Sequence, residues 1–168
     1  LGNCYYYGEG VEKDFKKAFC WYKIAAQKGH PNAQCSLGVC YECGRGVEKN
    51  EEKAVRWYER AARQGDDCGL YNLGLCYVNG QGVEKDEEKG AEYIERAAKM
   101  GNTRAQYSLG VCYEIGRGKE KDDAASLFWY TKSAEQGDPE AQNEVGVNYQ
   151  LGIGTEQDYK KAVKWYQK

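Results

Sequence analysis

A period of 36 residues runs through the whole chain, and its copies align without a gap. Copies begin at Leu1, Leu37, Leu73 and Leu109, and an incomplete fifth copy begins at Val145. Units of this length cannot bury their apolar faces alone, so they stack into a solenoid with one continuous core. We therefore expect one domain over residues 1–168, made of the repeats 1–36, 37–72, 73–108 and 109–144 and the partial repeat 145–168.

Glycine occupies four fixed columns of the repeat, which hold nearly all of the 21 glycines. Two of these columns are typical of helix ends, where glycine adopts the left-handed conformation at little cost. Capping residues and prolines predict two helices per repeat, helix A and helix B, over residues 31–43 and 51–64 in the second copy. No period-2 alternation occurs, so the expected fold class is all-α. Helix B should follow a capping side chain in each copy: Asp14, Asn50, Asp86, Asp122 and Asp158.

Helical spacing separates a core stripe from a variable stripe on helix A. Gly38 on helix A is expected to let helix B approach closely. In the second copy, the predicted core stripes are Ala33, Leu37, Cys40 and Tyr41 on helix A, and Ala54, Trp57, Tyr58, Ala61 and Ala62 on helix B.

Charge and hydropathy argue against nucleic-acid and membrane partners. The net charge is −2 and the pI is about 5.6, whereas nucleic-acid-binding domains usually carry a basic stripe. No apolar run approaches the ~20 residues that a membrane-spanning helix needs. The first residues show no signal-peptide pattern. Because the chain starts and ends within a repeat, we expect it to be part of a longer array.

The repeated pattern L-G-x-C-Y-x-x-G-x-G-V-E-K-D…K-A-x-x-W-Y-x-x-A-A-x-x-G closely resembles the Sel-1-like repeat, a relative of the tetratricopeptide repeat. The resemblance covers the whole chain. It implies a right-handed α/α superhelix that acts as an adaptor and assembles protein partners on a concave surface formed by the A helices. Some bacterial relatives carry disulfides at a C-x7-C spacing, which is absent here. The third copy departs from the pattern at Gly90, Tyr93 and Ile94, and the fourth at Lys119 and in the segment 124–126.

Half of the cysteines share one column on the core stripe. A disulfide or metal ladder is one interpretation, but equivalent residues of adjacent repeats lie about 8–10 Å apart, and a disulfide needs Cα atoms within about 7 Å. We interpret them as buried thiols, which favours a reducing compartment; a soft-metal clip at Cys40 and Cys43 is the less favoured alternative. The column holds Cys4, Cys40, Cys76 and Cys112, and the other cysteines are expected to be incidental: Cys20, Cys35, Cys43 and Cys68.

No catalytic residue, metal ligand or cofactor site is expected. His30, the only histidine, occupies the column in which the other copies place Asp66, Asn102 and Asp138. We interpret it as a surface helix cap rather than as a catalytic base or zinc ligand. The G-x-G motif recurs in every copy before an acidic segment, so turn geometry explains it better than phosphate binding.

The variable stripe of helix A is the predicted binding surface, because it carries tyrosines and aliphatic residues that the core does not require. For Val39, Leu75, Val111 and Val147, filling the seam between neighbouring A helices is an equally good interpretation. The predicted contact residues are Tyr6, Tyr7, Val39, Glu42, Tyr71, Leu75, Val78, Arg104, Tyr107, Val111, Glu114 and Ile115.

The sequence therefore predicts a non-enzymatic interaction module that binds a partner peptide or helix. Tyr71 and Tyr107 would anchor the partner, and charged residues such as Glu42 and Glu114 would select it. Two alternatives remain. One is β-lactam binding or hydrolysis, to which some relatives are linked, although the chain has no Ser-x-x-Lys motif. The other is end-to-end self-association of repeat arrays.

Overall fold

A computed structural model describes residues 1–168, which form helices and connecting turns and no strands. None of the helices combines the length and the apolar character that crossing a membrane requires. The helices are α1 (Gly2–Tyr7), α2 (Phe15–Gln27), α3 (Pro31–Cys43), α4 (Glu51–Arg63), α5 (Asp67–Asn79), α6 (Glu87–Lys99), α7 (Thr103–Ile115), α8 (Asp123–Glu135), α9 (Pro139–Leu151) and α10 (Tyr159–Tyr166). The all-α prediction is confirmed.

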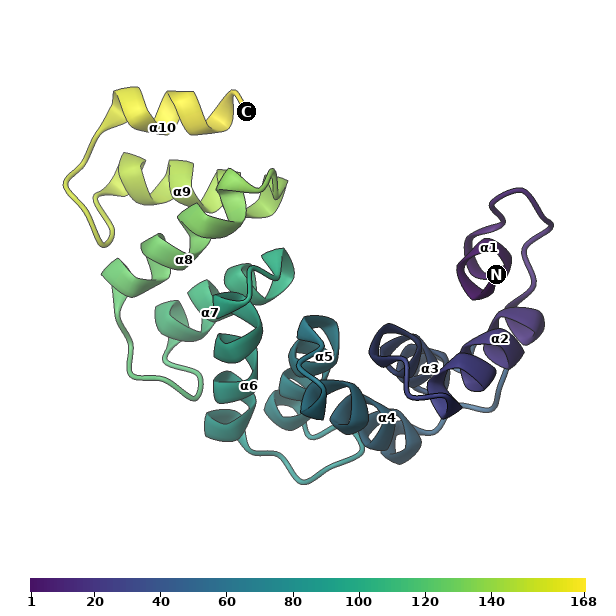
Figure 1. The fold of residues 1–168 in the computed structure, drawn as a ribbon. Coiled ribbons are helices and arrows are strands. Elements are labelled where there is room, and N and C mark those ends of the chain that lie inside the picture. The colour runs from purple at the N-terminus through teal and green to yellow at the C-terminus, as the bar shows by residue number, and fades with distance from the viewer. The chain divides into compact units, whose positions relative to one another are not determined.

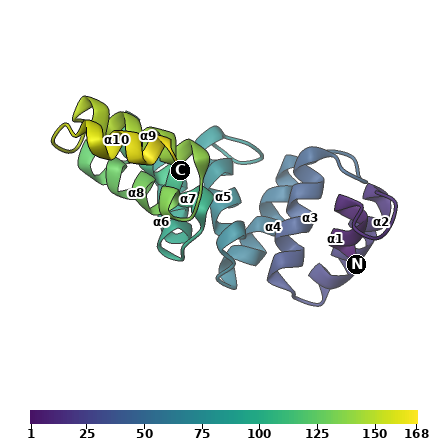
Figure 2. The same cartoon turned by 90° about the horizontal axis from the view of Figure 1, so that it is seen from above.

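The chain divides into two compact units, Leu1–Lys85 with α1 to α5 and Asp86–Lys168 with α6 to α10. Odd-numbered helices are the predicted A helices, and even-numbered helices are the B helices. Within each unit, helices that follow one another along the chain lie side by side (Figures 1 and 2). Each unit is therefore a stack of helix pairs.

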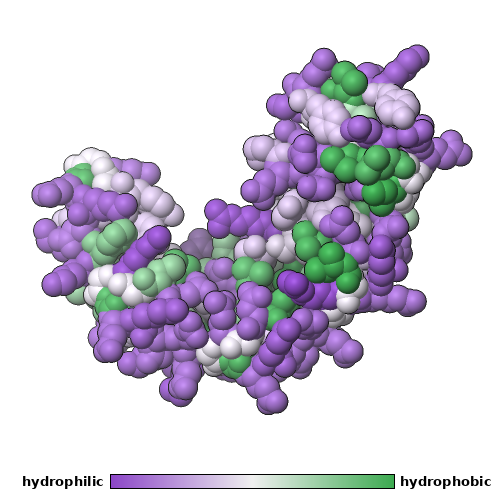
Figure 3. All heavy atoms as spheres, turned by 180° about the vertical axis from the view of Figure 1, so that it is seen from behind, coloured by the Kyte–Doolittle hydropathy of each residue, from purple (hydrophilic) through white to green (hydrophobic).

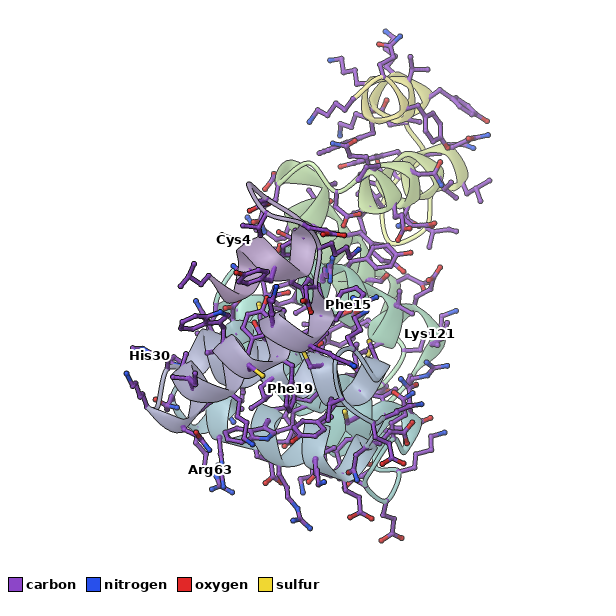
Figure 4. The ribbon with its side chains drawn as sticks, turned by 90° about the vertical axis from the view of Figure 1, so that its right-hand side faces the viewer. Cys4, Phe15, Phe19, His30, Arg63 and Lys121 are labelled. Atoms are coloured by element: carbon purple, nitrogen blue, oxygen red, sulfur yellow. The ribbon has the colours of Figure 1, made fainter.

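Helix starts follow the predicted capping pattern. The side chain of every predicted B-helix cap accepts a hydrogen bond from a backbone N–H in the first turn, as Asn50 does from Lys53 at 2.8 Å. Among the A helices, Asp66 caps α5 in the same way. His30 is different: it occupies the cap position of α3 and is exposed, but its side chain makes no capping hydrogen bond. Pro31 at the first helical position has no N–H, so α3 begins with one backbone donor fewer to satisfy, and Figure 4 shows His30 at the turn before α3.

Glycine has two separate structural roles here. Gly44 ends α3 with φ 67°, and Gly65 follows α4 with φ 76°, so both columns are left-handed as expected. Two other columns permit close approach. A Cβ on Gly38 would lie 2.5 Å from Cε1 of Tyr58, and one on Gly46 would lie 2.1 Å from the carbonyl oxygen of Phe15. The G-x-G motif thus ends helix A and brings its loop against the start of the preceding helix B.

The core follows the predicted stripes. Leu37, Cys40, Tyr58 and Ala61 are fully buried, while Trp57 is half-buried and packs across the boundary between repeats against the cluster that contains Tyr22. Burial of these apolar side chains supplies the main stabilising free energy. The repeats therefore cohere through side chains of neighbouring copies.

A glutamine relay, which the sequence analysis missed, also joins neighbouring repeats. Gln34 on α3 donates to the carbonyl of Ala26 at the end of α2 (3.2 Å), and Gln64 after α4 donates to Gln34 (2.7 Å). In the second unit, Gln106, Ala98 and Gln136 repeat this arrangement with the same two distances. The relay adds a side-chain donor to a helix-end carbonyl that also accepts a backbone N–H, from Gly29 for Ala26 and from Gly101 for Ala98.

Candidate functional site

Two glutamates of the predicted binding surface are engaged by tyrosines of the core. The Tyr58 hydroxyl donates to Glu42 at 2.8 Å, and the Tyr130 hydroxyl donates to Glu114 at 2.8 Å. Tyr58 is fully buried and Tyr130 nearly so. Glu42 and Glu114 therefore connect helix B to helix A, a structural role that the sequence analysis did not expect beside the partner selection predicted for them.

Val78 does not belong to the accessible surface. It lies in the same column as Glu42 and Glu114, but it is only 4% exposed. The third copy also has Ile94 in the column of Tyr58 and Tyr130. That copy therefore has neither the acceptor nor the donor of this hydrogen bond. This paired change between two columns is a signal that sequence comparison of the repeats could have detected.

The last residue of each A helix forms the most exposed column of the predicted surface. All five members are exposed, and four of them are apolar or thiol side chains. Figure 3 shows hydrophobic atoms gathered in separate groups on the second unit. In that unit, Ile115 ends α7 with 53% exposure, and Leu151 ends α9 with 60% exposure. The full column reads Tyr7, Cys43, Asn79, Ile115 and Leu151.

One turn earlier, the column of Val39 and Leu75 is half-buried in the second to fifth copies. In the second unit, Val111 packs against the core cluster of Tyr130 and Val145. These aliphatic residues thus both fill the seam and reach the surface.

The tyrosines predicted as anchors are also partly committed to the fold. Tyr71 and Tyr107 are half-buried. The Tyr107 ring lies against Tyr130, with 5.4 Å between the ring centroids. Truncating Tyr107 would therefore disturb the core as well as the surface.

Tyr6 and Tyr7 belong to an aromatic cluster at the start of the first unit. Their ring centroids are 4.9 Å apart, and the Tyr6 ring also lies 5.3 Å from that of Phe15. The Arg45 guanidinium hydrogen-bonds the Tyr6 hydroxyl and lies over both the Tyr6 and Phe15 rings. Burial raises the pKa of Tyr6 although Arg45 opposes this shift, so the phenol stays neutral. Tyr7 alone is widely exposed, at 65%.

Charged residues flank the apolar column in the second unit. Arg104 near the start of α7 and Glu140 near the start of α9 are both exposed. On an α-helix, position 104 lies about 16 Å from position 115. Each of these A helices thus carries one charge at its first turn and one aliphatic side chain at its last.

The cysteine column is buried in the second to fourth copies. Cys40, Cys76 and Cys112 are at most 3% exposed. Burial raises the pKa of Cys40 to about 11 and that of Cys76 to about 12, which keeps these thiols protonated and unreactive. Cys35 was expected to be incidental, but it is 6% exposed and its sulfur accepts a hydrogen bond from Asn72 at 3.3 Å. No disulfide is present.

The structure contains no group of three or more His, Cys, Asp or Glu side chains that could hold a metal ion. An acidic cavity of about 610 Å³ lies in the second unit beside Glu87, Glu92 and Lys119. Lys119 is ion-paired with Glu95. The lining of this cavity consists mainly of carboxylate side chains and of the glycines of a turn.

Comparison with known proteins agrees with this architecture. A model of the Sel1 repeat family matches residues 1–30, 31–66, 69–102, 103–138 and 139–168. These segments begin at or close to the A helices, whereas the second, fourth and fifth copies defined above begin six residues later and the third begins four residues later. No protein of curated function matches the chain.

Solved structures give the same result. The c5321 protective antigen of uropathogenic Escherichia coli is 41% identical with a TM-score of 0.90, over 99% of this chain and 36% of that one. A Sel1 repeat protein from Oxalobacter formigenes is 38% identical with a TM-score of 0.92, over 99% and 68% of the two chains. The immunity protein Pa5087 of Pseudomonas aeruginosa is 26% identical with a TM-score of 0.64, over 99% and 64%. The chain thus spans little more than a third of the E. coli protein, and it belongs to the Sel1 repeat family.

Proposed function

We propose that this chain is a non-enzymatic protein-interaction module that binds an apolar segment of a partner on the A-helix surface of its second unit. Sel1 repeat proteins are generally protein-interaction scaffolds. The observation that carries the proposal is the exposure of Ile115 and Leu151, 53% and 60%, at equivalent positions of α7 and α9. Capping and helix packing do not require a large aliphatic side chain there, since the third copy has Asn79 in the same column.

The chemistry of this surface defines the partner. Val111 and Ile115 are four residues apart on α7, and Val147 and Leu151 are four apart on α9, so each pair lies on one helix face. Two short aliphatic stripes on neighbouring repeats suit the apolar face of an amphipathic helix or an extended apolar segment.

Charge would set the orientation of the partner. Arg104 and Glu140 are exposed in the first turns of α7 and α9, so a partner with charges of both signs beside its apolar face complements them. Charges at the rim of a binding surface mainly affect specificity and association rate.

The first unit would contribute a second contact surface of different chemistry. Tyr7, with the half-buried Tyr6 and Tyr71, offers aromatic rather than aliphatic contacts. Val39 and Leu75 would complete this surface. Tyr7 is the most accessible residue of this surface.

The experiment separates surface recognition from folding. A displayed peptide library is selected on the wild-type chain, and the affinity of each enriched peptide is measured by calorimetry for two variants. The first carries Ile115→Ser with Leu151→Ser. The matched control carries Val163→Ser, since Val163 is equally exposed, at 51%, but lies on a B helix.

Loss of two half-exposed aliphatic side chains from the contact should weaken binding about 10- to 100-fold. The control should bind like the wild type, and the helical circular dichroism of both variants should be unchanged. Equal binding by the double variant and the wild type would contradict the proposed surface.

A further inference from the structure

Two cysteines in the first unit face each other across neighbouring A helices. Cys35 lies on α3, while Cys68 and Asn72 lie one turn apart on α5 and so share a helix face. Asn72 donates a hydrogen bond to the Cys35 sulfur at 3.3 Å, which fixes that sulfur against this face of α5. Cα atoms of α3 and α5 approach within 8 Å. The Cys68 thiol also hydrogen-bonds the Cys35 thiol.

The distance that disfavours disulfides within the core cysteine column does not apply to Cys35 and Cys68. Cys40 and Cys76 are equivalent residues one full period of 36 residues apart, and equivalent positions keep the separation of the helices, about 8–10 Å. Cys35 and Cys68 are not equivalent, because Cys68 lies three residues, nearly one helical turn, before the position that matches Cys35. The two side chains therefore extend toward each other from facing sides of the helices.

The two thiols differ in access. Cys68 is exposed at the start of α5, and Cys35 is buried. The hydrogen bond to Cys68, followed by burial and the nearby Asp66 carboxylate, raises the pKa of Cys35 well above its usual range. A reagent from solvent can therefore reach the Cys68 thiol first. The buried Cys35 thiol can react only in a second step, with the modified Cys68.

We propose that Cys35 and Cys68 form a dithiol oxidation site, which closes to an intramolecular disulfide between α3 and α5 by exchange with a low-molecular-weight disulfide. The proposal is independent of the partner-binding surface of the second unit. It assigns a role to two cysteines that lie in variable columns of the repeat.

The exchange is balanced in two steps. The Cys68 thiolate attacks one sulfur of oxidised glutathione, forms a mixed disulfide and releases one glutathione thiolate. Cys35 then loses its proton to solvent and attacks the Cys68 sulfur, which releases the second glutathione. One disulfide is reduced to two thiols, and the Cys35 and Cys68 thiols are oxidised to one disulfide. Blocking Cys68 in the first step removes its hydrogen bond with the Cys35 thiol, which eases deprotonation of Cys35.

The closed bridge would fasten the A helices of two successive repeats. It constrains the unfolded chain between α3 and α5, so the unfolding midpoint should rise, by about 5–10 °C for a loop of this length. It would also fix the spacing of the two helices that carry Val39 and Leu75.

The test incubates the purified full chain with oxidised glutathione, then blocks the remaining thiols by alkylation. Intact-mass analysis after alkylation of the unfolded chain should show six alkyl groups, against eight for the reduced chain, and no glutathione adduct. Tryptic mapping should show a linked pair of peptides joined through Cys35 and Cys68, and dithiothreitol should reverse both changes. The raised unfolding midpoint should disappear with the bridge.

Two variants at exposed thiols complete the test. Cys68→Ser should abolish the bridge and the midpoint shift, whereas Cys43→Ser, which removes the exposed thiol at the end of α3, should leave both unchanged. The proposal is overturned if oxidation stops at a glutathione adduct on Cys68, or if bridges involving Cys20 or Cys43 form in comparable yield.

Discussion

The hydroxyl of Tyr58 on α4 donates a 2.8 Å hydrogen bond to the carboxylate of Glu42 on α3. Tyr58 is fully buried, and burial, followed by the Glu42 charge, raises the pKa of its phenol far above the usual range. The phenol is therefore always a donor. Since Tyr130 and Glu114 repeat the bond in the second unit, it is a regular connection between helix A and helix B.

This connection predicts non-additive substitutions. Glu42→Val leaves the buried Tyr58 hydroxyl without an acceptor and should lower the free energy of unfolding by about 1–3 kcal/mol. In that background, Tyr58→Phe should hardly change the free energy of unfolding, because the hydroxyl that it removes no longer has an acceptor. Urea denaturation of the two single variants and the double variant measures the coupling. Strictly additive effects would show that the hydrogen bond is not energetically significant.

The close approach at Gly46 can be separated from its backbone conformation. Gly46 and Gly65 have almost the same φ, 75° and 76°, but a Cβ at Gly46 would meet Phe15 and one at Gly65 would meet nothing within 4 Å. Gly65→Ala should cost about 1 kcal/mol for the left-handed conformation. Gly46→Ala should cost this amount plus about 1–3 kcal/mol for displacing the neighbouring repeat. Thermal unfolding compares them, and equal losses would argue against the contact.

A departure of the fourth copy should be a weak point of the fold. Ser126 occupies a column where Ala18 and Ala54 stand in other copies, and its buried hydroxyl has no hydrogen-bond partner. Ser126→Ala should therefore raise the free energy of unfolding by about 1 kcal/mol. Chemical denaturation tests this, and the reverse exchange at an exposed position of the same helix, Ala124→Ser, should have little effect. A destabilised Ser126→Ala variant would mean that the hydroxyl does find a partner.

The second departure of this copy, Lys119, predicts a pH effect. Hydrogen bonds from Lys119 and then from Lys99 lower the pKa of Glu95 below its ordinary value of 4.5. The folded carboxyl thus binds its proton more weakly than the unfolded one. Its stabilising contribution is complete above about pH 4.5 and is lost as the pH falls through the lower folded-state pKa.

Glu95→Gln should therefore destabilise the chain at pH 7, by no more than about 1 kcal/mol for a pair that water still reaches. The difference from the wild type should shrink as the pH falls below 4.5. Lys119→Val, which restores the residue of the first three copies, should show the same trend. A difference that does not change with pH would exclude the ion pair as its origin.

The repeat made local structure predictable. Residues 31–43 were predicted as helix and form α3, and the predicted end of helix B at residue 64 lies one residue beyond Arg63. These features depend on capping side chains and glycine, which act within a few residues of the chain. The family and the all-α class followed from the same columns.

The site was predicted less well, because exposure on helix A depends on contacts with other helices. Helical spacing placed Glu42 and Val78 on a free face, but Glu42 receives the Tyr58 hydroxyl and Val78 is buried. Cys35 was misjudged for the same reason, since its partner Asn72 lies a whole repeat away. A comparison of the Glu42 column with the Tyr58 column across the copies would have revealed the Glu42–Tyr58 contact, because both residues change together in the third copy. The cysteine contact has no counterpart in other copies.

The central claim is that the ends of the A helices in the second unit contact a protein partner. Its most direct test places a photoreactive phenylalanine analogue at position 115, 151 or 163 of the full chain, and maps the crosslinks to a selected peptide by mass spectrometry. We predict crosslinks from positions 115 and 151 to the apolar face of the peptide, and none from position 163. Crosslinks from position 163 alone, with none from the other two, would contradict the claim.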